Sequence, residues 1–204
     1  MSKESTVYVV DDDQAIRHAM GLLLKSVGLK HEVFGSADEF LEKHSGNENG
    51  CLVLDIRMPG LGGLELQERL AESGNSLPII FITGHGDIPM AVEAMQKGAV
   101  DFIQKPFRDQ ELLDRISEAL DTAVERLSER ERRSDVHRRI DNLTKRELEV
   151  MQLVVTGKPN KITAHELGVS QRTVEIHRAR VMEKMGARSL AELVRMKLSV
   201  EQAN

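Results

Sequence analysis

The sequence is poor in aromatic residues and in cysteine: its 204 residues include no tryptophan, one tyrosine and a single cysteine, Cys51. A lone cysteine cannot form an intramolecular disulfide, and because Cys51 lies inside an apolar run, we expect no cysteine-based metal site. No apolar run reaches the roughly 18 residues of a membrane-spanning helix, and the first ten residues lack the pattern of a secretory signal peptide. We therefore expect a cytoplasmic protein with aliphatic cores and no membrane partner.

The charge is distributed unevenly along the chain. The net charge is −5, but residues 1–122 contain 11 Lys and Arg against 21 Asp and Glu, whereas residues 123–204 contain 17 against 12. An acidic first part followed by a basic second part predicts two domains with different partners. The basic domain could bind nucleic acid, although basic domains of other kinds are common.

Short apolar runs alternate with helical patterns over about the first 120 residues. The expected strands are 6–10, 31–34, 51–54, 79–83 and 100–104. Repeated β-then-α units predict a parallel sheet covered by helices on both faces, and right-handed crossovers limit the topology to a doubly wound α/β fold with five strands. In such folds the reactive crevice lies at the carboxyl ends of the strands.

Polar side chains stand at the ends of four of these strands: Asp11 and Asp12, then Asp55, then Thr83, then Lys105. Each has an ordinary interpretation when it is considered alone, because an aspartate can cap a helix or turn and a lysine can be a solvated surface charge. Carboxylates that converge at one edge of a sheet suit Mg²⁺, which prefers hard oxygen ligands. The lysine and the threonine hydroxyl could bind an oxyanion opposite the metal, so the set favours phosphoryl transfer to a carboxylate.

The motifs at these strand ends follow a specific order: an acidic pair, then D-x-x-M-P-G, then T-G, then K-P-F. Over residues 1–122 this order resembles the receiver domain of two-component response regulators. The resemblance implies that a histidine kinase phosphorylates Asp55 and that the Lys105–Pro106 bond is cis. It also implies that Mg²⁺ is bound by Asp11, Asp12, Asp55 and the backbone carbonyl of Arg57, with Asp11 helping through water. The residues that it implies for phosphoryl binding and switching are Thr83, Lys105 and Phe102.

Two further positions bear on how long a phosphoryl group would survive. Arg57 and His85 lie two residues after Asp55 and Thr83, and neither is the amide or carboxylate that would best orient an attacking water. We therefore expect slow hydrolysis. The alternative is an enzyme that forms an aspartyl phosphate, such as a phosphatase, but it would need a second acid near Asp55, and Ile56 and Arg57 offer none.

The middle of the chain predicts one long helix. Residues 109–141 contain no proline or glycine, and apolar residues recur at helical spacing as far as Leu127, after which the segment is mostly charged. A sustained coiled coil would need three or four full heptads. We therefore favour a solvated helical linker over residues 123–141.

The last part, 142–204, predicts four short helices. Thr144 and Glu147 form a capping box, and Gly168 stands in a tight turn between two helices, so the centre is typical of a helix-turn-helix. Val174 and Val181 should pack inward, as should Met185. The expected DNA contacts are Lys161, Gln171, Arg172, Thr173, Glu175, Ile176, Arg178, Ala179 and Arg180. An RNA-binding or protein-binding output is the alternative.

The residues LTKRELEV…NKITAHELGVSQRTVEIHRARVMEKM resemble the LuxR-type effector domain, and the whole chain is similar to a FixJ-type response regulator. This resemblance implies that phosphorylation promotes a homodimer, that the helix after Ser170 enters the major groove of promoter DNA, and that RNA polymerase is a further partner in regulating transcription, with activation favoured. Glu175 and Ala179 occupy positions that are basic in some relatives, so the base sequence cannot be transferred from them.

Overall fold

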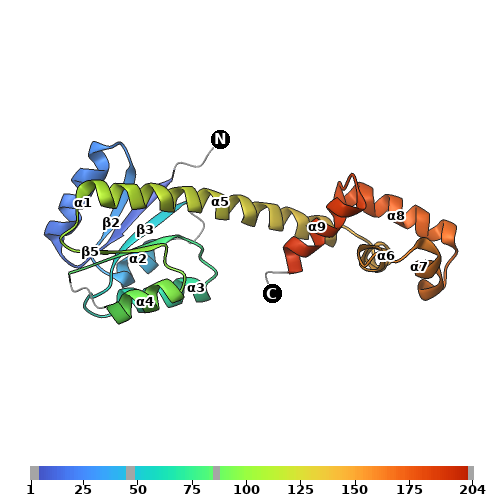
Figure 1. Cartoon of the computed structure of the whole chain (residues 1–204), viewed down its shortest axis with the longest axis horizontal. Helices are drawn as coiled ribbons and strands as arrows, with labels where there is room; N and C mark the ends of the chain where they lie inside the picture. The colour runs from blue at the N-terminus through green and yellow to red at the C-terminus, as the bar shows by residue number, and fades with distance from the viewer. Residues whose placement is uncertain (1–4, 45–48, 85–87, 202–204) are drawn as a thin grey trace. The chain divides into compact units, whose positions relative to one another are not determined.

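The computed structural model of the protein describes residues 5–44, 49–84 and 88–201 (Figure 1). The chain divides into two compact units, Met1–Leu127 and Ser128–Asn204. The first unit is an α/β fold and the second is all-α, as the sequence predicts.

The first unit is built on a five-stranded parallel sheet in the order β2-β1-β3-β4-β5. The strands are β1 (Thr6–Val10), β2 (Lys30–Phe34), β3 (Gly50–Asp55), β4 (Ile79–Thr83) and β5 (Asp101–Gln104). Each expected strand is present, and its ends differ from the prediction by at most one residue. The strand order reverses between β1 and β3, so the doubly wound topology places its crevice beside the carboxyl ends of these two strands.

Helices cover both faces of the sheet: α1 and α5 lie on one face, and α2, α3 and α4 lie on the other (Figure 1). The helices of this unit are α1 (Gln14–Ser26), α2 (Ala37–Lys43), α3 (Gly63–Glu72), α4 (Ile88–Gln96) and the first part of α5 (Asp109–Asp141). Alternate residues of β1 pack in the cores on the two faces of the sheet, because successive side chains of a strand point to opposite faces. Val9 packs in the same core as Leu24 of α1, whereas Tyr8 packs in the same core as Phe40 of α2.

Helix α5 has 33 residues and belongs to both units. Ile116 is fully buried in the core of the first unit. Val136 is 7% exposed and packs in the core of the second unit, as does the partly buried Ile140. The last turns of the segment expected as a solvated linker are therefore part of the C-terminal core. No helix in the described part of the chain is both long enough and apolar enough to cross a membrane.

The second unit packs four short helices after α5. They are α6 (Lys145–Val155), α7 (Asn160–Leu167), α8 (Gln171–Met185) and α9 (Leu190–Glu201). The capping box that opens α6 is present, with Thr144 accepting from the N–H of Glu147 and Glu147 accepting from the N–H of Thr144. Gly168 ends α7 with φ at 64°, a left-handed conformation that favours glycine, and so produces the turn into α8. The predicted helix-turn-helix is confirmed as α7 and α8.

Candidate acidic site and helix-turn-helix surface

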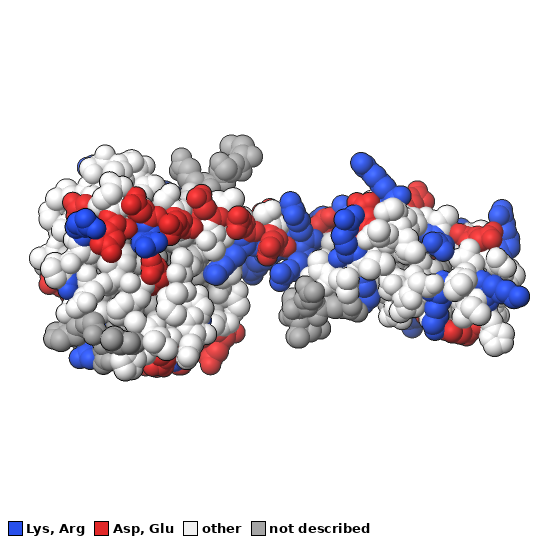
Figure 2. Space-filling model, in the orientation of Figure 1, with Lys and Arg blue, Asp and Glu red and all other residues white. Residues whose placement is uncertain are grey.

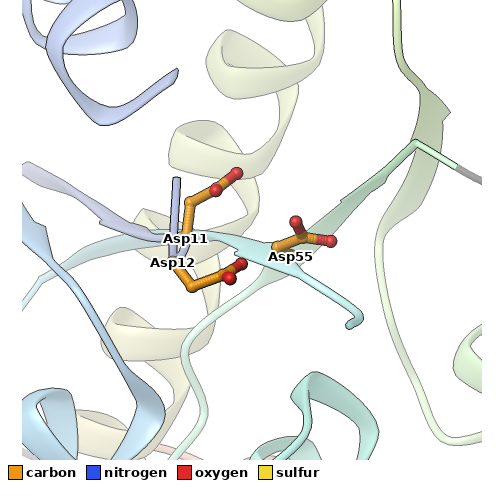
Figure 3. A group of neighbouring side chains, drawn as sticks. All are labelled: Asp11, Asp12 and Asp55. Carbon is orange, nitrogen blue, oxygen red and sulfur yellow. The ribbon is translucent and has the colours of Figure 1, made fainter. Parts of the chain in front are cut away.

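Three carboxylates meet at the carboxyl edge of the sheet. Asp11 and Asp12 follow β1, Asp55 ends β3, and one carboxylate oxygen from each lies within 4.8 Å of the others (Figure 3). Asp11 is fully buried and Asp55 is 7% exposed, whereas Asp12 is exposed, so the cluster is open to solvent on its Asp12 side. Three hard oxygen donors at this spacing are a chemically suitable set for Mg²⁺.

Lys105 crosses from the end of β5 to this cluster. Its Nζ atom donates to Asp11 Oδ2 at 2.7 Å and to Asp55 Oδ2 at 2.9 Å, and its side chain is 15% exposed. Because hydrogen bonds between ionised groups in a site with little water are strong, Lys105 holds the two carboxylates side by side. Three carboxylates against one ammonium still leave an excess of negative charge, which a divalent cation can balance.

Burial and charge act in opposite directions on these groups. Burial raises the pKa of Asp11, and its hydrogen bonds from Lys105 and from the N–H of Asp13 only partly offset that increase. Burial alone would lower the pKa of Lys105, but the hydrogen bonds to Asp11 and Asp55 outweigh it, so the pKa of Lys105 is raised. The lysine is therefore a cation throughout the neutral pH range.

Thr83 ends β4 and is 2% exposed, next to β5 in the sheet. Its carbonyl accepts the backbone N–H of Lys105 at 2.7 Å, so the two residues are linked through the main chain. The Lys105–Pro106 bond is cis, which confirms the expectation from the sequence. Phe102 is half-buried and packs against the core on the face covered by α2, α3 and α4.

Arg57 lies on the loop between β3 and α3. Its backbone N–H donates to Asp55 Oδ1 at 3.3 Å, and its guanidinium Nη2 lies 3.9 Å from Met90 Sδ of α4. The expectation that its carbonyl binds Mg²⁺ stays a prediction. His85, the other position that we connected with phosphoryl lifetime, lies outside the described residues.

The outer face of α8 is separated from its packing face as the sequence predicts. Val174, Val181 and Met185 are at most 1% exposed and pack in the core of the second unit. The expected DNA-contact residues that are exposed are Lys161, Gln171, Arg172, Glu175, Ile176, Ala179 and Arg180. This face combines cations with the carboxylate of Glu175, which lies 3.4 Å from a guanidinium nitrogen of Arg172.

Two of the expected DNA contacts are half-buried and bonded within the unit. The N–H of Thr173 donates to Ser170 Oγ at 3.0 Å, at the start of α8. Arg178 Nη1 donates to Asn160 Oδ1 at 3.0 Å, which joins α8 to the start of α7. The first contact caps α8 and the second joins α8 to α7, and the sequence did not indicate the second for Arg178.

Comparisons with known proteins identify both units. The sequence matches the family model of the response regulator receiver domain over residues 7–117 and that of bacterial regulatory proteins of the luxR family over residues 141–197. The transcriptional regulatory protein FixJ of Bradyrhizobium diazoefficiens is 42% identical over the whole of both chains. The chain belongs to the FixJ-type response regulators. It is thus a transcriptional regulator with a receiver domain and a LuxR-type DNA-binding domain.

Two other relatives support this assignment. Nodulation protein W of Bradyrhizobium diazoefficiens is 49% identical over 96% of this chain and 86% of that protein. The solved structure of the response regulator StyR is 46% identical and covers 96% of this chain and 98% of that chain, with a TM-score of 0.81. These two relatives, like FixJ, span receiver and output regions together rather than one of them alone.

Asp13 and Gly63 shape the loops beside the site in ways that the sequence did not predict. We allowed Asp11 or Asp12 as the cap of the first helix, but Asp13 is the cap, with its carboxylate accepting from the N–H of Ala15 at 2.8 Å. Gly63 was not singled out, yet a Cβ built on it would lie 2.3 Å from the carbonyl oxygen of Asp55. Only a residue without a side chain lets α3 approach the end of β3 this closely.

Figure 2 shows acidic side chains along one side of the receiver unit and basic side chains spread over the second unit. This pattern agrees with the charge asymmetry of the sequence. The net negative charge of the receiver unit, to which the three site carboxylates contribute, attracts cations. The basic second unit suits a polyanionic partner such as DNA.

Proposed function

We propose that a sensor histidine kinase phosphorylates the regulator on Asp55. The observation that carries this proposal is the position of Lys105, whose Nζ atom is hydrogen-bonded to Asp55 and Asp11 beside a solvent-exposed Asp12. A carboxylate oxygen of Asp55 attacks the phosphorus of a phosphohistidine, the phosphorus–nitrogen bond breaks, and the imidazole leaves with the electron pair of that bond. The lysine then compensates the charge on the transferred phosphoryl oxygens.

Asp11, Asp12, Asp55 and the carbonyl of Arg57 would hold Mg²⁺ next to that oxygen. When bound, the ion neutralises charge on the phosphoryl oxygens during transfer. The donor set supports this assignment because all three carboxylates offer hard oxygen ligands within 4.8 Å of one another. Asp11 would help to hold the ion through water, as the resemblance to receiver domains implies.

The phosphoryl group signals through Thr83 and Phe102. The Thr83 hydroxyl turns to a phosphoryl oxygen, the ring of Phe102 moves inward, and the surface formed by α4, β5 and α5 then supports a homodimer. The half-buried state of Phe102 supports this step, because such a side chain can move without opening a sealed core. Only phosphotransfer to its own Asp55 and slow loss of the phosphoryl group are expected as chemistry of the regulator itself.

The output is binding of promoter DNA by α8, with RNA polymerase as the further partner. We assign residues 1–122 to the receiver, 123–141 to a helical linker and 142–204 to the DNA-binding domain. One recognition helix makes few base contacts, so two subunits on adjacent half-sites provide the useful affinity and specificity. Since its binding partner is promoter DNA, we expect the regulator to work in the cytoplasm.

The experiment compares the full chain with Asp55→Asn, each incubated with Mg²⁺ and a small acyl phosphate donor. Sedimentation then measures the oligomeric state, and a gel shift measures binding to promoter fragments selected with the phosphorylated wild type. We expect the wild type to dimerise and to bind DNA more tightly after treatment, and the variant to do neither. Equal responses from the two proteins would contradict the proposal, and an equal shift with RNA would contradict the DNA assignment.

A further inference from the structure

We infer that Arg17 is a positioning residue for the Mg²⁺ ligands and acts through the backbone of Asp11. This inference rests on the metal site of the proposed function. Arg17 Nη1 donates to the carbonyl oxygen of Asp11 at 2.6 Å, from a position six residues further along the chain. The carbonyl belongs to the peptide that joins Asp11 to Asp12, so the contact fixes the unit that carries two of the three carboxylates.

The local structure explains how Arg17 reaches this carbonyl. Helix α1 begins directly after its cap Asp13, and the N–H of Arg17 donates to the Asp13 carbonyl at 3.0 Å. Side chains of a helix point back toward its N-terminus, so the guanidinium of a residue in the first turns lies over the preceding loop. A hydrogen bond from an ionised donor is also stronger than one between neutral groups. The contact is therefore a fixed feature of the loop after β1.

The guanidinium also lies near the loop after β2 and near a carboxylate of α2. Its central carbon lies 3.6 Å from the place where a Cβ on Gly35 would stand, directly after β2, and Glu39 Oε2 lies 3.6 Å from the same place. Glu39 Oε2 accepts the N–H of Gly35 at 2.7 Å. Its hydrogen bond from Lys43, that from Gly35 and the charge of Arg17 all lower the pKa of Glu39, which is thus an anion beside the guanidinium. Arg17 is therefore bonded to the loop after β1 and has an anion of α2 near its guanidinium.

The contact from Arg17 matters most for the position of Asp12. Asp11 is held by burial and by Lys105, and Asp55 is held by the strand that it ends and by Lys105. Asp12 is exposed, so packing contributes little to the direction of its carboxylate. Its backbone then decides where the carboxylate points, and Arg17 fixes the carbonyl of the peptide that leads into it. Groups of this kind, which orient a ligand without touching the metal, commonly change metal affinity by about 10–100-fold.

The test measures the Mg²⁺ dissociation constant of the full chain by calorimetric titration, together with its melting temperature without Mg²⁺. We expect Arg17→Met to weaken Mg²⁺ binding about tenfold. Arg17→Lys keeps one cationic donor, so it should weaken binding by about threefold or less. His18→Ala, at an exposed neighbour on the same helix, is the matched control and should leave the constant unchanged. Arg17→Met with the Mg²⁺ affinity of the wild type would overturn the inference.

Two additional variants keep the test decisive. One replaces Arg17→Met if that variant does not fold, and the other tests the metal site itself. If Arg17→Met does not fold, Glu39→Gln replaces it, and we expect about threefold weaker Mg²⁺ binding because the guanidinium loses the negative charge near it. An unchanged constant in Glu39→Gln would then overturn the inference. Asp12→Ala tests the metal site itself, since equal Mg²⁺ binding by Asp12→Ala and the wild type would refute the proposed site rather than the role of Arg17.

Discussion

The ammonium of Lys105 lies 2.9 Å from the carboxylate of Asp55 and 2.7 Å from that of Asp11, so it connects the ends of β3 and β1. The same atom therefore occupies a position between two of the carboxylates that we assign to Mg²⁺. An ammonium there both stabilises the cluster and opposes an incoming cation, because like charges repel at this distance. The balance between these two effects can be measured.

We predict that Lys105→Met binds Mg²⁺ more tightly than the wild type, by about threefold or more, because the cluster then loses the ammonium that pairs with Asp11 and Asp55. Calorimetric titration measures the affinity. The same variant should fail to dimerise after treatment with an acyl phosphate, since the phosphoryl oxygens lose their lysine partner. Weaker Mg²⁺ binding in Lys105→Met would show that the lysine organises the ligands more than it repels the ion. Arg69→Met, on an exposed helix face, is the control.

The contact between α3 and the end of β3 leads to a prediction for Gly63. A Cβ at this position would lie 2.3 Å from the carbonyl oxygen of Asp55, and the obstacle is backbone rather than a flexible side chain. We expect Gly63→Ala to destabilise the receiver unit by about 3 kcal/mol, measured by urea unfolding. Gly84→Ala, where nothing lies within 4 Å of the added carbon, should change stability by less than about 1 kcal/mol. Equal stability of the two variants would contradict the close approach.

Much of the fold and of the site follows from the sequence, because local and global signals agree. The five strands are continuous apolar runs buried on both faces, and a parallel sheet brings Asp55 and Lys105 to one edge whatever the loops do. Arg17, Gly63 and the start of the C-terminal core at Val136 were not predictable in this way. The structural roles of these residues depend on which backbone or core packs against them. The tertiary structure determines those neighbours, and sequence periodicity does not.

A pH dependence follows from Glu147, whose pKa is lowered from 4.5 to about 2 by its hydrogen bond from Lys184 and by that from the N–H of Thr144. A pKa that is lowered in the folded state adds stability at pH values above the unfolded-state pKa. That stability is lost as the pH falls from 4.5 through about 2. We expect Glu147→Gln to cost roughly 1–2 kcal/mol at pH 7 and much less near pH 2.

Unfolding of the second unit at several pH values, followed by circular dichroism, checks this prediction. Glu149→Gln is the control on the same helix, because its carboxylate pairs with Arg146 at the surface and is 45% exposed. A surface pair of this kind contributes under about 1 kcal/mol. If the difference between wild type and Glu147→Gln did not depend on pH, the ion pair with Lys184 would not be the cause.

The reading face of α8 is tested at Arg172, which is 81% exposed. If Arg172 contacts a base edge, Arg172→Ala should cost about 1–3 kcal/mol on the selected promoter and relax the preference at one base pair. If it contacts a phosphate, the loss should be uniform across sequences, and the salt dependence should fall by about one unit. Binding assays at several salt concentrations distinguish these results. Arg188→Ala, beyond the end of α8, should bind as the wild type does.

The central claim is that Asp55 accepts the phosphoryl group, and locating that group on the chain tests it most directly. The full-length regulator is incubated with Mg²⁺ and its kinase or an acyl phosphate, reduced with borohydride to convert an aspartyl phosphate to homoserine, digested, and sequenced by mass spectrometry. We predict homoserine at position 55 and at no other aspartate, with none when Asp55→Asn is treated in the same way. Homoserine at Asp11 or Asp12 with position 55 unchanged would contradict the account.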